Sequence, residues 1–389
     1  MLKKISWLVL CCMVLGTLSF TACMPDVGEL PDGSDLMLES DSDTDGASDT
    51  VLVTDPEVTD PVTDGGDDET DPPVKKKSID IYIIAGQSNG SGYTKYDASV
   101  LSGLWSRYNK GSSNVIYTGR AEYTNNVNTS NVSTGVNEVK YWTPVVAGQG
   151  RSTSHMGAEV GMAKILNEKY YKYDVATGEN RTAGIIKFAH GGTSLLNSTS
   201  GENAASGNWV SPSYAEYKNI SHSGLTGGLY RNLLTQVKSS VTKLKALGYN
   251  DINIKGVFWM QGEGDRYNPA EYKIAFKYFA SDLRRDLGNI MGEDLSDLAI
   301  MIGEISETSG SASTDSVATN QAFIAMQRGL AQEMDNVYVV SSGKYKINWL
   351  DENGANKNGQ DGWHWTTADM FNIGVEVGEC ILDNILKVS

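Results

Sequence analysis

Five short apolar runs, separated by segments with helical spacing, constrain the fold of this chain more than any other feature. The runs are typical of buried strands. Strand, helix and strand in repetition predict a parallel sheet that is covered on both faces. The expected strands are Ile79–Ala85, Thr182–Ala189, Ile252–Met260, Leu298–Ile305 and Asn336–Ser341. The expected helices are Gly157–Tyr170, Gly224–Leu247, Pro269–Leu287 and Ser316–Met334.

The segment Leu101–Gly150 interrupts this alternation. It is rich in Asn, Ser, Thr, Gly and Tyr and shows only weak periodicity. We interpret it as a long surface insertion near the substrate, which could contain a hairpin. The chain from residue 78 to 389 is long for one average domain, but α/β folds reach this length. We therefore expect one folded domain over residues 78–389.

The first 22 residues have the pattern of a secretory signal. Two lysines precede a short apolar run, Ile5–Leu18, and small residues follow it. Cys23 comes directly afterwards, which resembles the lipobox of bacterial lipoproteins, although Phe20 stands where an aliphatic residue is usual. The sequence therefore predicts export across the cytoplasmic membrane and a lipid on Cys23 as the only membrane anchor at the cell surface. Ordinary cleavage near this point is the alternative.

Residues 23–77 have the composition of a disordered, solvated linker. Asp, Ser, Thr, Gly and Pro dominate, and Thr-Asp-Pro occurs three times. The segment holds 17 acidic residues against three lysines, so it carries most of the formal net charge of −16. The remaining domain is close to neutral. Nucleic-acid binding, which needs a basic face, is therefore not expected.

Cysteines and histidines give no sign of a metal centre. Cys380 is the only cysteine after residue 77, and its apolar surroundings predict a small core residue. No cysteine or histidine cluster has the spacing of a zinc site. We predict neither a metal nor an organic cofactor.

Four polar blocks carry the candidate chemistry. Three of them follow expected strands, at the edge where open α/β sheets place their sites. The first block is Gly86-Gln87-Ser88-Asn89-Gly90, in which a serine comes straight after a buried strand. The second block is His190–Ser194, the third is Gln261–Asp265, and the fourth is Asp361–Thr366 near the C-terminus.

These blocks contain the groups that nucleophilic catalysis by serine requires. A serine hydroxyl needs a base, and histidine has a suitable pKa near neutrality. His364 is the best candidate because Asp361 stands three residues earlier, where a turn can direct its carboxylate to the imidazole. We predict that Ser88 is the nucleophile, His364 the base and Asp361 the acid. Glu263 is an alternative acid, which could instead bind a sugar hydroxyl or support its loop.

The four blocks in this order resemble the SGNH hydrolase superfamily. Gly-Gln-Ser-Asn and Trp-x-Gln-Gly-Glu resemble its sialate O-acetylesterase and acetylxylan esterase branch, carbohydrate esterase family six. The resemblance covers residues 79 to about 386 and implies a flavodoxin-like three-layer α/β/α sandwich with a mostly parallel sheet. It also implies oxyanion donors, namely the backbone N–H of Ser88, one N–H of the Gly191-Gly192 pair and the side-chain amide of Gln261. Which of the two glycines donates stays open.

The resemblance favours a serine esterase that removes O-acetyl groups from a carbohydrate outside the cell, through an acetyl-enzyme. Acetylated xylan, pectin, host glycans and peptidoglycan are all compatible substrates. Sugar rings stack on aromatic side chains, and Trp363 and Trp365 flank His364, so we expect both near the site. The alternatives are an SGNH esterase or lipase that acts on other esters, and a non-catalytic surface module that binds glycans. A complete set of nucleophile, base and donors favours an enzyme.

Overall fold

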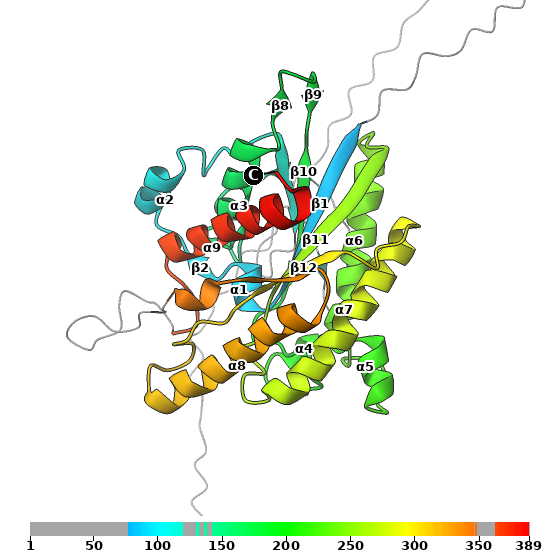
Figure 1. The fold of residues 1–389 in the computed structure, drawn as a ribbon, viewed down its shortest axis with the longest axis vertical. Coiled ribbons are helices and arrows are strands. Elements are labelled where there is room, and N and C mark those ends of the chain that lie inside the picture. Colours follow the sequence, from blue (N-terminus) through cyan, green and yellow to red (C-terminus); the bar gives the residue numbers. More distant parts are fainter. Residues whose placement is uncertain are drawn as a thin grey trace, which may run out of the picture. The chain divides into compact units, whose positions relative to one another are not determined.

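The computed structural model describes residues 77–119, 130–131, 136–137, 142–345, 347 and 362–388, and a seven-stranded sheet lies at its centre (Figure 1). Six of these strands run parallel, and one edge strand runs antiparallel to its neighbour. The predicted mostly parallel sheet is confirmed. In spatial order the strands are β13 (Val337–Val340), β12 (Ala299–Gly303), β11 (Asp251–Met260), β1 (Ser78–Gly86), β10 (Ala183–Ala189), β3 (Val115–Gly119) and β6 (Thr143–Pro144).

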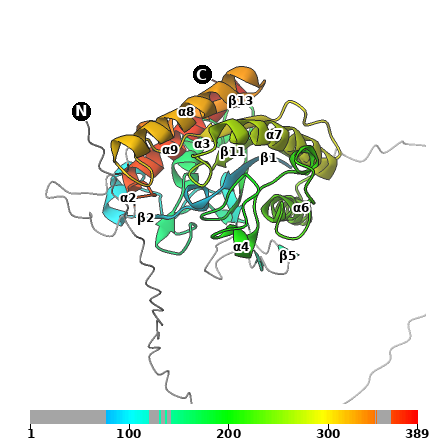
Figure 2. The same ribbon diagram turned by 90° about the horizontal axis from the view of Figure 1, so that it is seen from below.

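Helices cover both faces of the sheet, which confirms the three-layer α/β/α sandwich (Figure 1 and Figure 2). One face packs against α6 (Gly228–Ala246), α7 (Pro269–Met291) and α8 (Thr314–Glu333). The opposite face packs against α3 (Glu159–Lys169) and α9 (Thr367–Cys380). The shorter elements are α1 (Ser88–Ser91), α2 (Ala98–Leu104), α4 (Asn203–Ser206), α5 (Pro212–Tyr217), a 3-10 turn (Ser342–Lys344), a π-helical turn (Ile381–Leu386), and the antiparallel pairs β2 (Thr94–Lys95) with β7 (His155–Met156), β4 (Ser130–Asn131) with β5 (Val136–Asn137), and β8 (Tyr173–Asp174) with β9 (Glu179–Asn180).

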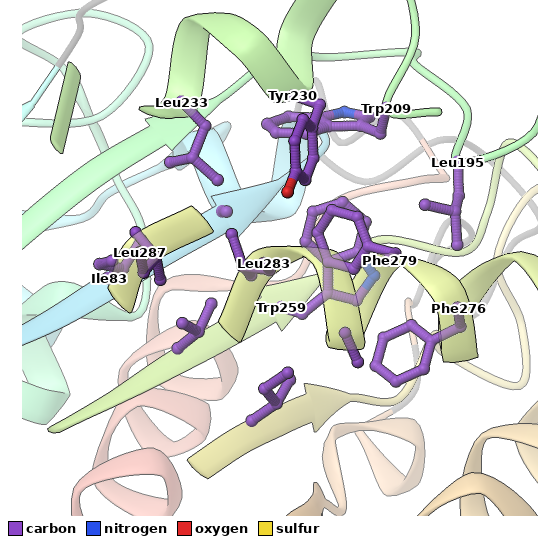
Figure 3. Close-up of a cluster of buried hydrophobic side chains, with 14 of the residues drawn as sticks. Ile83, Leu195, Trp209, Tyr230, Leu233, Trp259, Phe276, Phe279, Leu283 and Leu287 are labelled. Carbon is purple, nitrogen blue, oxygen red and sulfur yellow. The ribbon is translucent and has the colours of Figure 1, made fainter. Parts of the chain in front are cut away.

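The alternation of side chains along β1 divides the interior into two cores. Ile81 and Ile83 face the core beneath α6, α7 and α8, whereas Tyr82 and Ile84 face the other core. Burying one such apolar side chain contributes roughly 1.5–3 kcal/mol. The first core is strongly aromatic. Figure 3 shows part of it, including Trp209, Tyr230, Trp259, Phe276 and Phe279.

Helix α7 illustrates how the sequence specifies these layers. Pro269 occupies the first turn, where its missing N–H removes no hydrogen bond. Buried side chains then recur at spacings of three and four residues, so one stripe faces the sheet. The helix continues to Met291, four residues beyond the predicted end.

All five expected strands are present, as β1, β10, β11, β12 and β13, and the four expected helices are α3, α6, α7 and α8. The prediction that Leu101–Gly150 is a surface insertion is wrong in part. This segment contributes β3 and β6 to the central sheet, where β3 pairs with β10. The sequence signal for β3 is only the short apolar run Val115-Ile116-Tyr117 in a polar stretch. Helix α9, which we did not predict, packs against α3.

The predicted signal segment, Cys23 and the linker up to residue 76 lie outside the described residues. Cys380 is half-buried at the end of α9, and burial raises the pKa of its thiol to about 11. Within the part of the chain that the structure describes, no helix combines the length and apolar character that crossing a membrane requires.

Candidate active site

Three neighbouring strands end at the same level and carry the first three blocks. Gly86 at the end of β1 pairs with Ala189 of β10 on one side and with Met260 of β11 on the other. The chain crosses from one side of β1 to the other between β10 and β11. This edge of the sheet is therefore its topological switch point, where open α/β folds place their ligands.

Gly86 permits the turn that presents Ser88. Its φ is 134°, and a Cβ at this position would collide with the carbonyl of Met260. A larger residue would force β1 and β11 apart. The backbone N–H of Gln87 then donates to the Met260 carbonyl over 2.9 Å, and Ser88 begins α1. The candidate nucleophile is thus fixed to two strands at once.

A cavity of about 370 Å³ lies over these loops. Ser88 and His364 both line it, together with Glu263, Gly191 and Gly192. Its size lies in the range of small-molecule sites. Two larger hollows, of about 740 and 920 Å³, lie elsewhere, and neither contains a predicted catalytic residue. The other residues that line the smaller cavity are Gln87, Tyr93, Glu202, Gly264, Arg266 and Trp363.

The loop of His364 is held by the segment that follows β1. Asn89 donates from Nδ2 to the carbonyl of Trp363 over 3.1 Å. Thr94 donates from Oγ1 to the carbonyl of Trp365, also over 3.1 Å. Both carbonyls that flank His364 are therefore bound from the same segment that carries Ser88.

The start of α9 fixes the other end of this loop. Thr366 caps the helix, because its Oγ1 accepts the N–H of Asp369 over 3.2 Å. His364 lies two residues before this cap, and its ring centre is 5.0 Å from that of Tyr93. The imidazole is thus placed by a helix cap, two carbonyl contacts and an aromatic neighbour.

Glu263 supports this arrangement through Asn89. Only 4% of Glu263 is exposed, and its Oε1 accepts a hydrogen bond from Asn89 Nδ2 over 2.7 Å. Burial raises the pKa of the Glu263 carboxyl, while the Asn89 hydrogen bond and the nearby His364 act in the opposite direction. Because Asn89 also binds the carbonyl of Trp363, Glu263 is linked to the histidine loop. Asp361, the predicted acid, lies outside the described residues.

The two glycines of the second block differ in position. Gly191 is buried, and a Cβ built on it would lie 3.4 Å from Ser88 Cβ. Its backbone therefore lies beside the nucleophile side chain, and a Cβ at this position would collide with the Tyr93 hydroxyl at 2.6 Å. Gly192 is exposed, and a Cβ there would instead meet the side chain of Glu202. Of the two glycines, Gly191 lies nearer to the side chain of Ser88.

Gln261 is the predicted donor that the structure does not bring to the cavity. Its Nε2 donates to Asp265 Oδ2 over 2.7 Å and to the carbonyl of Thr193 over 3.2 Å, so both amide hydrogens have acceptors. It is not among the residues that line the cavity. Asp265 also accepts the N–H of Leu195 over 2.7 Å, and burial raises its pKa to about 6. With these contacts, Gln261 connects the second and third blocks.

The two tryptophans beside His364 have different surroundings. Trp363 lines the cavity and 37% of it is exposed. Trp365 is buried, and its indole Nε1 donates to the carbonyl of Tyr345 over 2.7 Å. Of the two, only Trp363 offers a surface to a ligand in this cavity.

Sequence reasoning gave no role to several polar residues of the cavity, among them Arg266 and Gln87. Arg266 donates from Nη1 to the carbonyl of Glu263 over 2.7 Å, and its guanidinium lies 4.9 Å from the ring centre of Trp363. Gln87 accepts at Oε1 from the N–H groups of Gly262 and Gly264, each over 3.3 Å. Both could have been considered from the sequence, since Gln87 precedes the serine and Arg266 follows the third block directly.

The arrangement suits acyl transfer to a serine. The serine Ser88, the histidine His364 and the glycine Gly191 line one cavity, and this reaction uses a hydroxyl, an imidazole and backbone N–H groups. Among the described residues, no three His, Cys, Asp or Glu side chains gather in a way that could hold a metal ion.

Comparison with known proteins agrees with this chemistry. The family model described as carbohydrate esterase, sialic acid-specific acetylesterase, matches residues 78–382. Among solved structures, the chain resembles NanS with 16% identity and a TM-score of 0.50, over 80% of this chain and 98% of that chain. A carbohydrate acetylesterase from Xanthomonas citri is 13% identical, with a TM-score of 0.46 over 79% of this chain and 56% of that chain. No curated protein sequence matches the chain.

The structural likeness concerns the fold, whereas the family match extends over most of the sequence. The matched residues include all four blocks. The resemblance to the sialate O-acetylesterase branch is confirmed. The chain belongs to the sialic acid-specific acetylesterase family of carbohydrate esterases and is a carboxylic ester hydrolase for acetylated carbohydrate.

Proposed function

We propose that this protein removes O-acetyl groups from carbohydrates outside the cytoplasm through an acetyl-enzyme on Ser88. His364 is the general base, and Asp361 is the acid that orients it. One observation carries the proposal most strongly. Ser88 and His364 line the same cavity, and the carbonyls on both sides of His364 accept hydrogen bonds from the segment that follows Ser88.

In the first half-reaction, Ser88 Oγ attacks the acetyl carbonyl while His364 takes the hydroxyl proton. The tetrahedral intermediate collapses, the sugar oxygen leaves, and His364 returns the proton to it. In the second half-reaction, His364 takes a proton from water, which attacks the acetyl carbonyl on Ser88. Acetate leaves, and Ser88 regains its proton. The carboxylate of Asp361 stabilises the imidazolium in both halves.

The negative oxygen of each intermediate needs donors that are in place beforehand. We assign this role to the backbone N–H groups of Ser88 and Gly191. The close approach of Gly191 to the side chain of Ser88 supports the choice of that glycine. Gln261 would act indirectly, because its amide holds the second and third blocks together.

The cavity offers features that suit a sugar leaving group. Trp363 presents a partly exposed aromatic surface against which a sugar ring could pack. Arg266 adds a cation to the same wall, which would favour a sugar that carries a carboxylate. Sialic acid, the sugar in the family's description, has this chemistry. Release of acetate from O-acetylated sialosides, compared with acetylated xylan, pectin and peptidoglycan, would identify the natural substrate.

The direct test uses purified protein and 4-nitrophenyl acetate. Ser88→Ala should lower kcat/KM by roughly 10³-fold or more, because the nucleophile is lost. Ser102→Ala, which alters an exposed serine on α2, is the matched control and should keep full activity. Retention of activity by Ser88→Ala would contradict the proposal. Comparable rates on long acyl esters would favour a lipase-like enzyme, and binding of glycans without any hydrolysis would favour a non-catalytic module.

We further propose that the protein is exported and lipid-anchored through Cys23, with residues 23–77 as a linker. The lysines, the apolar run and the position of the cysteine support this reading. Cys23→Ala should move the protein from the membrane fraction to the soluble fraction and leave hydrolysis of 4-nitrophenyl acetate unchanged. A variant that stays with the membrane would contradict the lipid anchor.

A further inference from the structure

Tyr93 borders the space directly beside the candidate nucleophile. It lies five residues after Ser88 and lines the cavity. A Cβ built on Gly191 would be 2.6 Å from the Tyr93 hydroxyl oxygen and 3.4 Å from Ser88 Cβ. The phenol and the nucleophile side chain therefore adjoin the same point on the backbone of Gly191. No motif in the sequence pointed to this tyrosine.

Neighbours on two sides hold the ring of Tyr93 in this position. The ring centre of His364 lies 5.0 Å away, with the two planes at 30°. The guanidinium of Arg151 lies 4.6 Å from the centre of the tyrosine ring. The backbone of Arg151 is fixed, because its N–H donates to the carbonyl of Gly92 over 2.9 Å, while its side chain is exposed.

The strand after Tyr93 completes this support. Thr94 pairs with Met156 in the short antiparallel ladder of β2 and β7, and its hydroxyl binds the carbonyl of Trp365. The backbone on the C-terminal side of Tyr93 is therefore tied both to β7 and to the histidine loop. A tyrosine has few side-chain torsions, so a ring held in this way makes a firm wall.

We propose that Tyr93 is the residue that limits the acyl group to acetyl. The inference rests on the proposed function, since it assumes that the acyl group is carried by Ser88. With the acyl carbon on Ser88 Oγ, the methyl group would lie against the Tyr93 phenol, which borders the cavity beside Ser88. Each further methylene would have to displace a ring held by His364 and Arg151.

The test is the ratio of kcat/KM for 4-nitrophenyl butyrate to kcat/KM for 4-nitrophenyl acetate. This ratio does not depend on the fraction of enzyme that is active. The wild type should prefer acetate, and Tyr93→Ala should raise the ratio by roughly 10–100-fold, the usual discrimination for one or two methylenes. Tyr93→Leu, which keeps an apolar side chain for folding, should change the ratio in the same direction.

Two controls separate the ring from other effects. Tyr93→Phe keeps the bulk of the ring and should keep the preference for acetate. Tyr173→Ala alters an exposed tyrosine on β8, outside the cavity, and should leave the ratio unchanged. An unchanged ratio in both Tyr93→Ala and Tyr93→Leu would overturn the role of Tyr93, while hydrolysis of acetate that depends on Ser88 would leave the proposed function standing. Failure of the wild type to hydrolyse either ester would overturn both.

Discussion

Two fully buried glutamates near the carboxyl ends of the strands differ in their partners. Glu159, at the start of α3, pairs with the buried Lys187 at 3.0 Å, and Lys187 also donates to the carbonyl of Gln149 over 2.7 Å. Glu263 has the neutral Asn89 as its partner and borders the cavity. The pair of Glu159 and Lys187 therefore connects α3 to β10. The pair of Glu263 and Asn89 instead supports the loop of His364 beside the cavity.

Removing the cation of the first pair should have the largest effect on stability. Lys187→Met leaves the carboxylate of Glu159 buried without its ammonium partner, which should cost roughly 3–5 kcal/mol of unfolding free energy. Urea denaturation measures this loss. The kcat/KM per active enzyme should stay within about threefold of the wild type, because neither residue lines the cavity.

A second substitution sharpens this prediction. Lys187→Met combined with Glu159→Gln removes both charges, and the double variant should recover a large part of the lost stability. A loss of activity with little loss of stability in Lys187→Met would place this pair with the reactive loop and contradict the distinction between the two glutamates.

Removing the amide of the second pair should affect activity more than stability. Asn89→Ala deletes the hydrogen bonds to Glu263 and to the carbonyl of Trp363, so His364 loses one of its supports. We expect kcat/KM to fall roughly 10–100-fold and the unfolding free energy to fall by about 1–2 kcal/mol. Asn384→Ala, an exposed asparagine near the C-terminus, is the matched control and should change neither. Unchanged kcat/KM in Asn89→Ala would contradict the claim that Asn89 supports the position of His364.

The smallest expected effect is a pH dependence of stability at Glu263. Burial raises the pKa of its carboxyl above the ordinary value of 4.5, so ionisation costs more in the folded than in the unfolded protein. This free-energy cost is absent below the pKa of the carboxyl in the unfolded protein. It grows as the pH rises from there through the pKa of the carboxyl in the folded protein. Glu263→Gln removes the charge and keeps an oxygen that can accept from Asn89. Its Tm relative to the wild type should therefore increase from about pH 4 to about pH 8. A constant difference in Tm across this range would contradict the buried ionisation.

The sequence predicted the layers of this fold because its central strands are unusually clear. The apolar runs that became β1, β10 and the second half of β11 are buried on both faces and end in glycine-containing blocks. It did not reveal β3, since the strand lies in a polar stretch and only pairing with β10 distinguishes it from a loop. Ser88 and His364 line one cavity, as the resemblance implied from the order of the motifs.

The contacts within the site were harder to predict. The sequence could not show that the amide of Gln261 would bind Asp265, because the direction of a side chain depends on the neighbouring loop. Tyr93 and Arg266 lie outside the motif patterns and reach the cavity only through the path of the backbone after β1 and β11. The catalytic roles of Ser88, His364 and Asp361 and the lipid on Cys23 remain predictions.

The central claim is that His364 activates Ser88 as the nucleophile. Reaction with diisopropyl fluorophosphate followed by peptide mass spectrometry tests it most directly. We predict complete inhibition with one phosphoryl adduct on Ser88, and little or no labelling at the same reagent concentration in His364→Ala. Complete inhibition with the adduct on a different serine, or equal labelling of Ser88 in His364→Ala, would contradict the claim.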